Sequence, residues 1–407
     1  MDGLSSSDRD LMARSANAPM LAQVQAWAGI NSGSRNLAGL AVMAGMLADA
    51  FAALPGNLRL EEPDFVDAVT PDGKTEAVVH GRHLHLSVRP GAPVRLLLTG
   101  HMDTVFSADH PFQSLTWVDA GRLNGPGVAD MKGGLAVMLA ALQALEGVGE
   151  WRGIGYDVVI NSDEEVGSPS SAGLLRRASQ GKLAALTYEP ALPDGTLAGA
   201  RGGSGNFSLT VTGRSAHAGR NPEEGRNALL AAADMALRLK AASGTGFTCN
   251  PARIDGGAPN NVVPGHAVLR VNFRPITAQD QQRVEQLIQR VIADVTRDHD
   301  VAISLHGSFG RPPKPIDQKA QRLFELVRRC GTELGLAVDW RSTGGVCDGN
   351  NIAACGVPVV DTMGARGGAI HSDGEYLIVE SLSERARLSA LTLLRIAQGR
   401  LSLEEPA

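Results

Sequence analysis

The sequence has 407 residues, a formal net charge of −5 and 43% hydrophobic residues. This length predicts two or three domains, since a domain usually spans about 100–200 residues. The 43 Asp and Glu outnumber the 38 Lys and Arg, so the basic surface typical of nucleic-acid binding is missing. No run approaches the roughly 18 apolar residues of a membrane span, and no secretory signal is visible. The four cysteines are too few for a disulfide framework, so we expect a cytoplasmic protein without a nucleic-acid or membrane partner.

Short runs rich in Val, Ile and Leu alternate with helical patterns over most of the chain. In chain order we expect a helix at 20–28, a helix at 36–53, a hairpin turn at 70–73, a strand at 94–98, a helix at 131–146 with Asp130 as its N-cap, a strand at 156–160, a helix at 170–179, strands at 183–187 and 357–360, and a helix at 381–398. This alternation predicts an α/β domain with a mostly parallel central sheet. His83 and His85 are interpreted as residues of a solvated hairpin.

The segment from 203 to 310 has a different pattern. Its expected elements are a strand at 206–212, a helix at 224–242, strands at 247–255 and 266–273, a helix at 278–297 and a strand at 301–306. This β-α-β-β-α-β order is typical of a ferredoxin-like α+β unit, and it interrupts the α/β alternation. We therefore predict a main domain in two parts, residues 1–202 and 311–407, and an inserted domain at 203–310. The Gly-rich and Pro-rich stretches at its ends would act as hinges.

Side chains that suit metal ions follow four of the expected strands. They are His101, Asp103, Glu164, Glu165, Glu189 and His371. Ligand sites in open α/β sheets form at the carboxyl ends of the strands, so we expect these groups to converge. Each residue alone is more simply explained as a polar loop residue. A group of buried carboxylates, however, needs compensating cations, so the full pattern favours a metal site.

Six short motifs follow one another in an order that is very specific. They are GHMDTVF (100–106), GPGVADMKGG (125–134), SDEEVGS (162–168), YEP (188–190), GRSAHAG (213–219) and HSDGEY (371–376). With them the chain resembles, over nearly its whole length, the co-catalytic zinc metallopeptidase superfamily. That superfamily contains bacterial folate-cleaving glutamate carboxypeptidase, succinyl-diaminopimelate desuccinylase, acetylornithine deacetylase and aminoacylase. The carboxypeptidase branch is the most similar, through GHMDTVF, TGG-x-x-D (343–348) and the HSD run.

The resemblance implies two Zn²⁺ ions per chain, at a site that Mn²⁺ or Co²⁺ could also occupy. One metal would be held by His101 and Glu189 and the other by Glu165 and His371, with Asp130 bridging both and a cis peptide bond following it. Two such cations can hold a bridging water and polarise a carbonyl group. Glu164 would act as the general base toward this water. Asp103 would orient the imidazole of His101.

The resemblance also implies residues that bind the substrate. Arg274 would bind a terminal carboxylate with two parallel hydrogen bonds. Asn261 and the loop of Thr343, Gly344 and Gly345 would form the rest of the substrate cradle. His217 would donate to the oxyanion of the reaction, from an inserted domain that serves as lid and dimerisation domain and reaches the partner's site. A homodimer is therefore expected.

The motifs restrict the class of substrate, but they do not identify the substrate itself. Glutamate-cleaving relatives carry a Lys at the position of Thr196, whereas Arg311 retains another basic position. The favoured reading is a binuclear zinc hydrolase that cleaves a peptide or N-acyl amide bond next to a free carboxylate, with release of a C-terminal glutamate as one version. An N-acyl amino acid deacylase of the deacetylase or desuccinylase type is the alternative. A catalytically silent metal-binding dimer and a two-metal phosphate esterase are less favoured.

Overall fold

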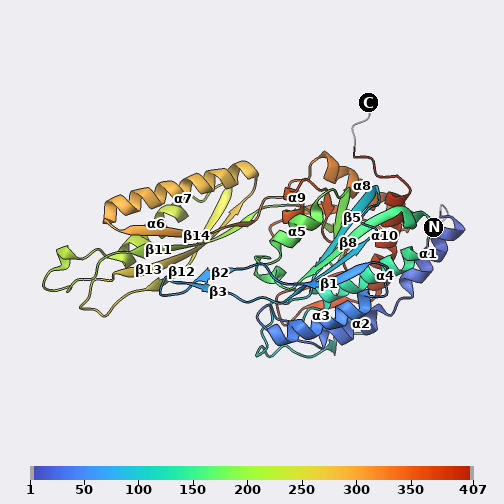
Figure 1. Cartoon of the computed structure of the whole chain (residues 1–407), viewed down its shortest axis with the longest axis horizontal. Helices are drawn as coiled ribbons and strands as arrows, with labels where there is room; N and C mark the ends of the chain where they lie inside the picture. Colours follow the sequence, from blue (N-terminus) through green and yellow to red (C-terminus); the bar gives the residue numbers. More distant parts are fainter. Residues whose placement is uncertain (1–3, 404–407) are drawn as a thin grey trace.

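The computed structural model describes residues 4–403, which form a larger and a smaller lobe (Figure 1). The larger lobe contains both ends of the described chain, and the smaller lobe is made from the middle of the sequence. The chain leaves the larger lobe after β10, which ends at Arg201, and returns after β14, which ends at Arg311. The boundaries at 202/203 and 310/311 fall beside these joints, but the division into domains stays a prediction.

A six-stranded sheet forms the centre of the larger lobe, in the order β1-β4-β8-β5-β9-β16. Its strands are β1 (Asn57–Glu61), β4 (His83–Val88), β8 (Ile154–Asn161), β5 (Val94–His101), β9 (Ala184–Thr187) and β16 (Val359–Val360). Only β4 runs against the others, because it is antiparallel to both β1 and β8 while the remaining neighbours are parallel. The prediction of a mostly parallel sheet is confirmed.

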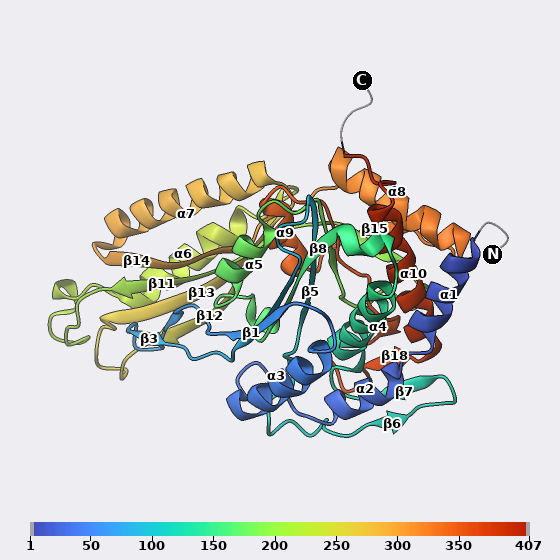
Figure 2. The ribbon, with the colours of Figure 1, turned by 45° about the vertical axis from the view of Figure 1, so that its right-hand side comes forward.

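Helices cover both faces of this sheet (Figure 2). Helices α5 and α9 pack together on one face, whereas α4 packs against α1 and α10 on the other, and α8 lies beside α10. The helices of this lobe are α1 (Ser6–Ala16), α2 (Met20–Ala28), α3 (Leu37–Phe51), α4 (Gly134–Glu146), α5 (Ala172–Ser179), α8 (Gln318–Glu333), α9 (Asp348–Ala354) and α10 (Glu380–Ala397). Residues 128–146 are apolar and long enough for a membrane span, but 94% of that window is buried, which is the property of a core helix.

Two local predictions in the larger lobe are wrong. Asp130 is not the N-cap of the helix, because Asp130 and Met131 have non-helical backbone angles and α4 begins only after Gly133. Residues of the GPGVADMKGG motif form a kinked segment, Val128–Gly133, instead of the first turn of the helix. His83 does not lie in a solvated hairpin: β4 is an internal strand, and the His83 side chain is buried, with Ser162 N donating to its Nδ1 at 3.2 Å.

The smaller lobe is a four-stranded antiparallel sheet with two helices on one face (Figure 1). In chain order its elements are β11 (Ser204–Thr212), α6 (Ala228–Ala241), β12 (Phe247–Gly256), β13 (His266–Pro275), α7 (Ala278–His299) and β14 (Ala302–Arg311), and the strand order is β12-β13-β11-β14. The ferredoxin-like pattern is therefore confirmed. Helix α6 starts four residues later than predicted, because Asn227 caps it by accepting from Leu230 N at 3.0 Å.

Smaller sheets of short strands complete the fold. Strands β10 (Leu197–Arg201) and β15 (Trp340–Thr343) are parallel neighbours, and a small sheet contains β17 (Gly367–Gly368), β18 (Tyr376–Ile378), β7 (Arg122–Asn124) and β6 (Thr116–Trp117). The predicted turn at 70–73 joins β2 (Asp67–Val69) to β3 (Thr75–Ala77). This hairpin comes from the larger lobe but contacts the smaller one: His306 Nε2 lies 2.9 Å from Asp67 Oδ1, and Arg270 donates to Val69 O at 2.7 Å.

Candidate metal centre

Acidic and imidazole side chains converge at the carboxyl ends of the parallel strands. His101 ends β5, Glu164 and Glu165 follow β8, and Glu189 follows β9. Asp130 reaches the same place from the segment before α4, and His371 from the loop after β17. All of these except His101 line a cavity of about 290 Å³. The strand ends therefore bring together residues that are up to 270 positions apart in the sequence.

The carboxylate of Asp130 lies between the two histidines. Its Oδ1 is 3.2 Å from His101 Nε2, and its Oδ2 is 3.3 Å from His371 Nε2. His101 Nε2 is also 3.7 Å from Glu189 Oε2, while His371 Nε2 is 3.1 Å from Glu165 Oε2. This arrangement has the topology expected of a bridging carboxylate with two ligand pairs. The peptide bond between Asp130 and Met131 is cis, as the resemblance implied.

Asp103 joins the end of β5 to the loop after β8. Its Oδ1 accepts from Glu164 N and its Oδ2 from Glu165 N, both at 3.1 Å. Oδ2 also accepts from Ser34 Oγ at 2.7 Å, and Oδ1 lies 3.4 Å from His101 Nδ1. The fully buried Asp103 thus orients the His101 ring and also fixes the backbone that carries both glutamates.

Glu375 performs the corresponding task for Asp130, and the sequence reasoning gave it no role. Its Oε1 accepts from Ala129 N and Asp130 N at 3.0 Å, and its Oε2 accepts from Gly127 N at 3.1 Å. The side chain is only 1% exposed. Its place in the HSDGEY motif was the available signal, but only the fold shows that this loop meets the Gly127–Asp130 segment.

The electrostatics of the cluster favour the binding of cations. Burial raises the pKa of Glu165 to about 7, with Asp130 adding to the shift, and burial also raises the pKa of Glu189. Hydrogen bonds to Asp130 and Glu165 raise the pKa of His371 to about 11. For His101, burial alone would lower the pKa, but the surrounding carboxylates raise it well above its usual value. Burial thus disfavours the ionised form of the two glutamates, and bound cations would restore it.

The residues present fit a site for divalent metal ions. Potential ligand atoms form two groups of three, and within each group the atoms lie within 4.8 Å of one another: His101 with Asp130 and Glu165, and His101 with Glu164 and Glu189. The buried Glu189 Oε1 has no hydrogen-bond partner among the described residues, so it is available as a ligand atom. Imidazole and carboxylate ligands suit Zn²⁺, and also Mn²⁺ or Co²⁺.

Glu164 is held by a buried arginine at the joint between the lobes. Arg311 Nη2 donates to Glu164 Oε1 at 2.7 Å, while its Nη1 contacts Asp348 Oδ1 and donates to Asn351 Oδ1 at 2.7 Å. Burial raises the pKa of Glu164 well above its usual value, and Arg311 opposes this rise. Arg311 was identified from the sequence only as a retained basic residue, and Asp348 only as the last residue of a motif.

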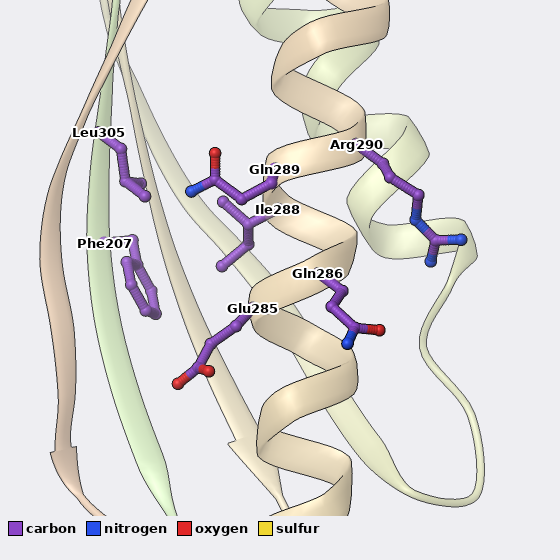
Figure 3. Close-up of a pocket in the computed structure, with 7 residues that line it drawn as sticks. All are labelled: Phe207, Glu285, Gln286, Ile288, Gln289, Arg290 and Leu305. Carbon is purple, nitrogen blue, oxygen red and sulfur yellow. The ribbon is translucent and has the colours of Figure 1, made fainter.

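The predicted substrate residues are divided between two regions. A cleft of about 860 Å³ adjoins the acidic cluster, and it is lined by Arg274, Gly344 and Gly345, together with Glu164. Thr343 lines the 290 Å³ cavity, whereas Thr196 lines neither space. A further cavity of about 560 Å³ lies between α7 and the four-stranded sheet of the smaller lobe, where Phe207, Ile288 and Leu305 face one another (Figure 3). It contains none of the predicted site residues.

His217 and Asn261 line neither the cavity nor the cleft. Both residues are exposed, and their loops are joined by a hydrogen bond from Ala218 N to Asn261 O at 2.9 Å. The loop between β11 and α6, which carries His217, lies at the end of the smaller lobe that points away from the larger lobe (Figure 1). Within one chain, the structure therefore does not bring these two residues to the acidic cluster.

Comparison with known proteins identifies the family. The model of peptidase family M20/M25/M40 matches residues 97–395. Carboxypeptidase G2 from Pseudomonas sp. (strain RS-16) is 30% identical over 370 residues, which cover 87% of this chain and 86% of the relative. A succinyl-diaminopimelate desuccinylase from Herminiimonas arsenicoxydans is 28% identical over 276 residues, which cover 64% of this chain and 71% of the relative.

A solved structure has the same fold over almost the entire chain. The crystal structure of a tripeptidase from Staphylococcus aureus superposes with a TM-score of 0.71 at 22% identity, covering 95% of this chain and 98% of that chain. The predicted fold class is thus confirmed by the topology and by this neighbour. On the match to the family model and to the relatives, the chain belongs to peptidase family M20/M25/M40 and is a metallopeptidase or amidohydrolase of that family.

Proposed function

We propose that this protein is a binuclear metal-dependent hydrolase that cleaves a peptide or N-acyl amide bond next to a free carboxylate, in the manner of a carboxypeptidase. The convergence of Asp130 with two histidines and two glutamates, beside Glu164, carries this proposal. The similarity to carboxypeptidase G2 supports the carboxypeptidase version, in which the released amino acid is glutamate. His101, Asp130, Glu165, Glu189 and His371 are the proposed ligands of two Zn²⁺ ions.

The metal ions would supply Lewis acidity to the substrate carbonyl and lower the pKa of water at the site. The side chains of the protein carry out the proton transfers. Glu164 takes a proton from the water as the water oxygen forms a bond to the carbonyl carbon, and it delivers that proton to the nitrogen of the leaving amine as the C–N bond breaks. Arg311 holds the Glu164 carboxylate in place at 2.7 Å. Because Arg311 ends β14, the last strand of the smaller lobe, this hydrogen bond links the general base to the smaller lobe.

The cleft beside the cluster supplies the groups that orient the substrate. Arg274 is exposed at the end of β13, and only its Nε has a hydrogen bond among the described residues, a 3.0 Å bond to Asn272 Oδ1. Its terminal nitrogens are therefore available for the carboxylate next to the scissile bond. Gly344 and Gly345 expose their backbone in the same cleft, and Thr343 lies beside them.

We further propose that the active protein is a homodimer formed through the smaller lobe. Strand β12 is an edge strand with one unpaired side. Beside it, Leu230 and Leu237 of α6 are 60% and 71% exposed, and Ile254 of β12 is 37% exposed. Apolar side chains of this size are buried in dimer interfaces. Pairing of this surface between two chains could place His217 and Asn261 at the partner's cluster, where His217 would donate to the oxyanion.

An N-acyl amino acid deacylase is the second candidate function, supported by the similarity to succinyl-diaminopimelate desuccinylase. The same cluster and base serve both reactions, since each breaks an amide bond beside a carboxylate. We also propose a cytoplasmic location. All four cysteines are unpaired, and three are buried, as is usual in a reducing compartment.

Hydrolysis of a substrate panel by the zinc-reconstituted protein tests the function. The panel contains benzoyl-glutamate, folyl-glutamate, dipeptides, N-acetyl amino acids and N-succinyl-diaminopimelate. We expect metal-dependent release of an amino acid, and Glu164→Gln should bind two metals per chain but lose orders of magnitude in kcat. Glu285→Gln, a change at an exposed residue of the other lobe, is the control. Full activity of Glu164→Gln would exclude Glu164 as the base, and silence of the metal-loaded protein across the panel would contradict the function.

Mixed dimers test the contribution of His217. We expect His217→Ala to lower kcat with intact metal content. Mixing this variant with Glu164→Gln should restore part of the activity, because one of the two sites then contains a complete set of residues. An absence of restoration in dimers that do exchange subunits would contradict donation across the dimer.

A further inference from the structure

The 290 Å³ cavity has one wall that the reaction itself does not use. Besides the acidic cluster, it is lined by the apolar side chains of Leu192, Leu197, Val346 and Ile370. Arg341 is the exposed arginine among the residues that line this cavity. Apolar side chains with an exposed arginine beside them suit a short carbon chain that ends in a negative charge.

Arg341 lies beside another residue of the cavity lining. It belongs to β15, and its register partner on the parallel strand β10 is Ala198, which also lines the cavity. Among residues 4–403 the Arg341 side chain has neither a hydrogen bond nor an ion pair, although its charge helps to lower the pKa of the exposed Asp194. The guanidinium group therefore has its donors free for a ligand.

The second arginine of this cavity, Arg201, is engaged through all three of its side-chain nitrogens. Arg201 donates to Asp361 through Nε at 2.7 Å and through Nη2 at 3.3 Å, and its Nη1 donates to Gly345 O at 2.9 Å. Arg201 is buried, so these bonds are protected from water. Arg201 is thus a structural support of the loop of Gly345, and Arg341 remains as the arginine that can bind a charged group of the substrate.

We propose that Arg341 determines the specificity of this enzyme by binding a second carboxylate of the substrate. The inference rests on the proposed function, in which Arg274 binds the carboxylate next to the scissile bond. The substrate would then be an amide with two carboxylates that lie on the two sides of the cleft. The second one is either the side-chain carboxylate of an acidic amino acid that is released, or the far carboxylate of a dicarboxylic acyl group. Arginine can bind either carboxylate with two parallel hydrogen bonds.

Two matched pairs of substrates distinguish these sources. Benzoyl-glutamate and benzoyl-glutamine differ in the charge of the released side chain, whereas N-succinyl-norleucine and N-butanoyl-norleucine differ in the charge of the acyl group. We expect the zinc-loaded wild type to prefer the acidic member of one pair. In Arg341→Gln the kcat/KM for that member should fall about 10- to 100-fold, while the neutral member changes little, because one charge-assisted contact is lost.

Three variants separate this role from a general disturbance. Arg341→Lys should keep part of the preference, since the positive charge remains. Arg341→Glu should reverse it, so that the neutral member becomes the better substrate. Arg290→Gln, at an exposed arginine on the outer side of α7, is the matched control and should behave as wild type (Figure 3). Two metals per chain in every variant would show that the cluster is intact.

The outcomes distinguish a failure of the proposed role of Arg341 from a failure of the proposed hydrolase function. If Arg341→Gln lowers kcat/KM equally for both members of each pair, or leaves the acidic preference unchanged, Arg341 does not bind the second carboxylate. If the metal-loaded wild type hydrolyses no member, the proposed function fails, and binding then decides the inference. Calorimetry should show tighter binding of glutarate than of its monoamide to the wild type, and no such difference for Arg341→Gln. Equal affinities in the wild type would overturn the inference.

Discussion

Replacing Arg311 by Met should both destabilise the larger lobe and impair catalysis. Arg311 is 3% exposed, and it donates to Glu164 Oε1 at 2.7 Å and to Ser168 Oγ at 2.9 Å while also contacting Asp348. Methionine fills a similar volume but leaves two buried carboxylates without their cation. Removal of one partner from a buried ion pair typically costs about 3–5 kcal/mol of unfolding free energy, and we expect a loss in this range.

Urea unfolding followed by tryptophan fluorescence measures the stability change, from the shift in midpoint at unchanged slope. Arg311→Lys should lose less unfolding free energy than Arg311→Met, because the positive charge remains although lysine cannot contact the Glu164 and Asp348 carboxylates in the same way. Arg238→Met is the control, since Arg238 pairs with Asp234 and Asp298 at the solvent-exposed surface, where ion pairs contribute little. An Arg311→Met protein as stable as this control would refute the reasoning.

The same substitution predicts a change in pH dependence. Burial already raises the pKa of Glu164, and Arg311 is the first group that opposes the rise. Without Arg311 the pKa of Glu164 moves further upward, so a smaller fraction of the base is ionised at neutral pH. The acidic limb of the kcat profile should therefore shift to higher pH in Arg311→Met. An unchanged limb would mean that Arg311 does not govern the ionisation of Glu164.

Three further predictions concern the supports of the site and the lobes. Glu375→Gln removes one acceptor oxygen from the Gly127–Asp130 segment, so zinc affinity should fall roughly 10- to 100-fold in a chelator competition; an unchanged affinity would contradict the role of Glu375. Burial alone would raise the pKa of Asp361, but Arg201 and Lys314 hold it below 3.8, so its stabilisation is present above that pH and is lost as the pH falls further. Melting temperatures should consequently fall less steeply for Asp361→Asn than for the wild type as the pH is lowered from about 4 to about 2, and parallel curves would argue against this. Asp67→Ala should increase hydrogen exchange of the β2–β3 hairpin by removing its contact to His306, whereas Asp72→Ala, which contacts only Thr70 and Lys74 of the hairpin, should not.

The order of secondary structure could be predicted from the sequence because it depends on local patterns. Alternating apolar runs and helical spacing identified five of the helices and four of the central strands, and the β-α-β-β-α-β segment was recognised with small shifts at its ends. Errors occurred where tertiary contacts override local preference. Asp130 has the chemistry of an N-cap, yet its backbone is held by Glu375 in a non-helical segment.

The sequence by itself predicted which side chains gather at the candidate site, because imidazoles and carboxylates at the ends of parallel strands share one edge of the sheet. Only the tertiary structure decided which residues support them. Asp103 fixes the backbone of both glutamates, Glu375 fixes Asp130, and Arg311 reaches Glu164 from 147 positions away. The free guanidinium of Arg341 likewise became visible only when Arg201 was found to be engaged. Such partners carry no local signal, because long-range contacts are set by the packing of whole elements.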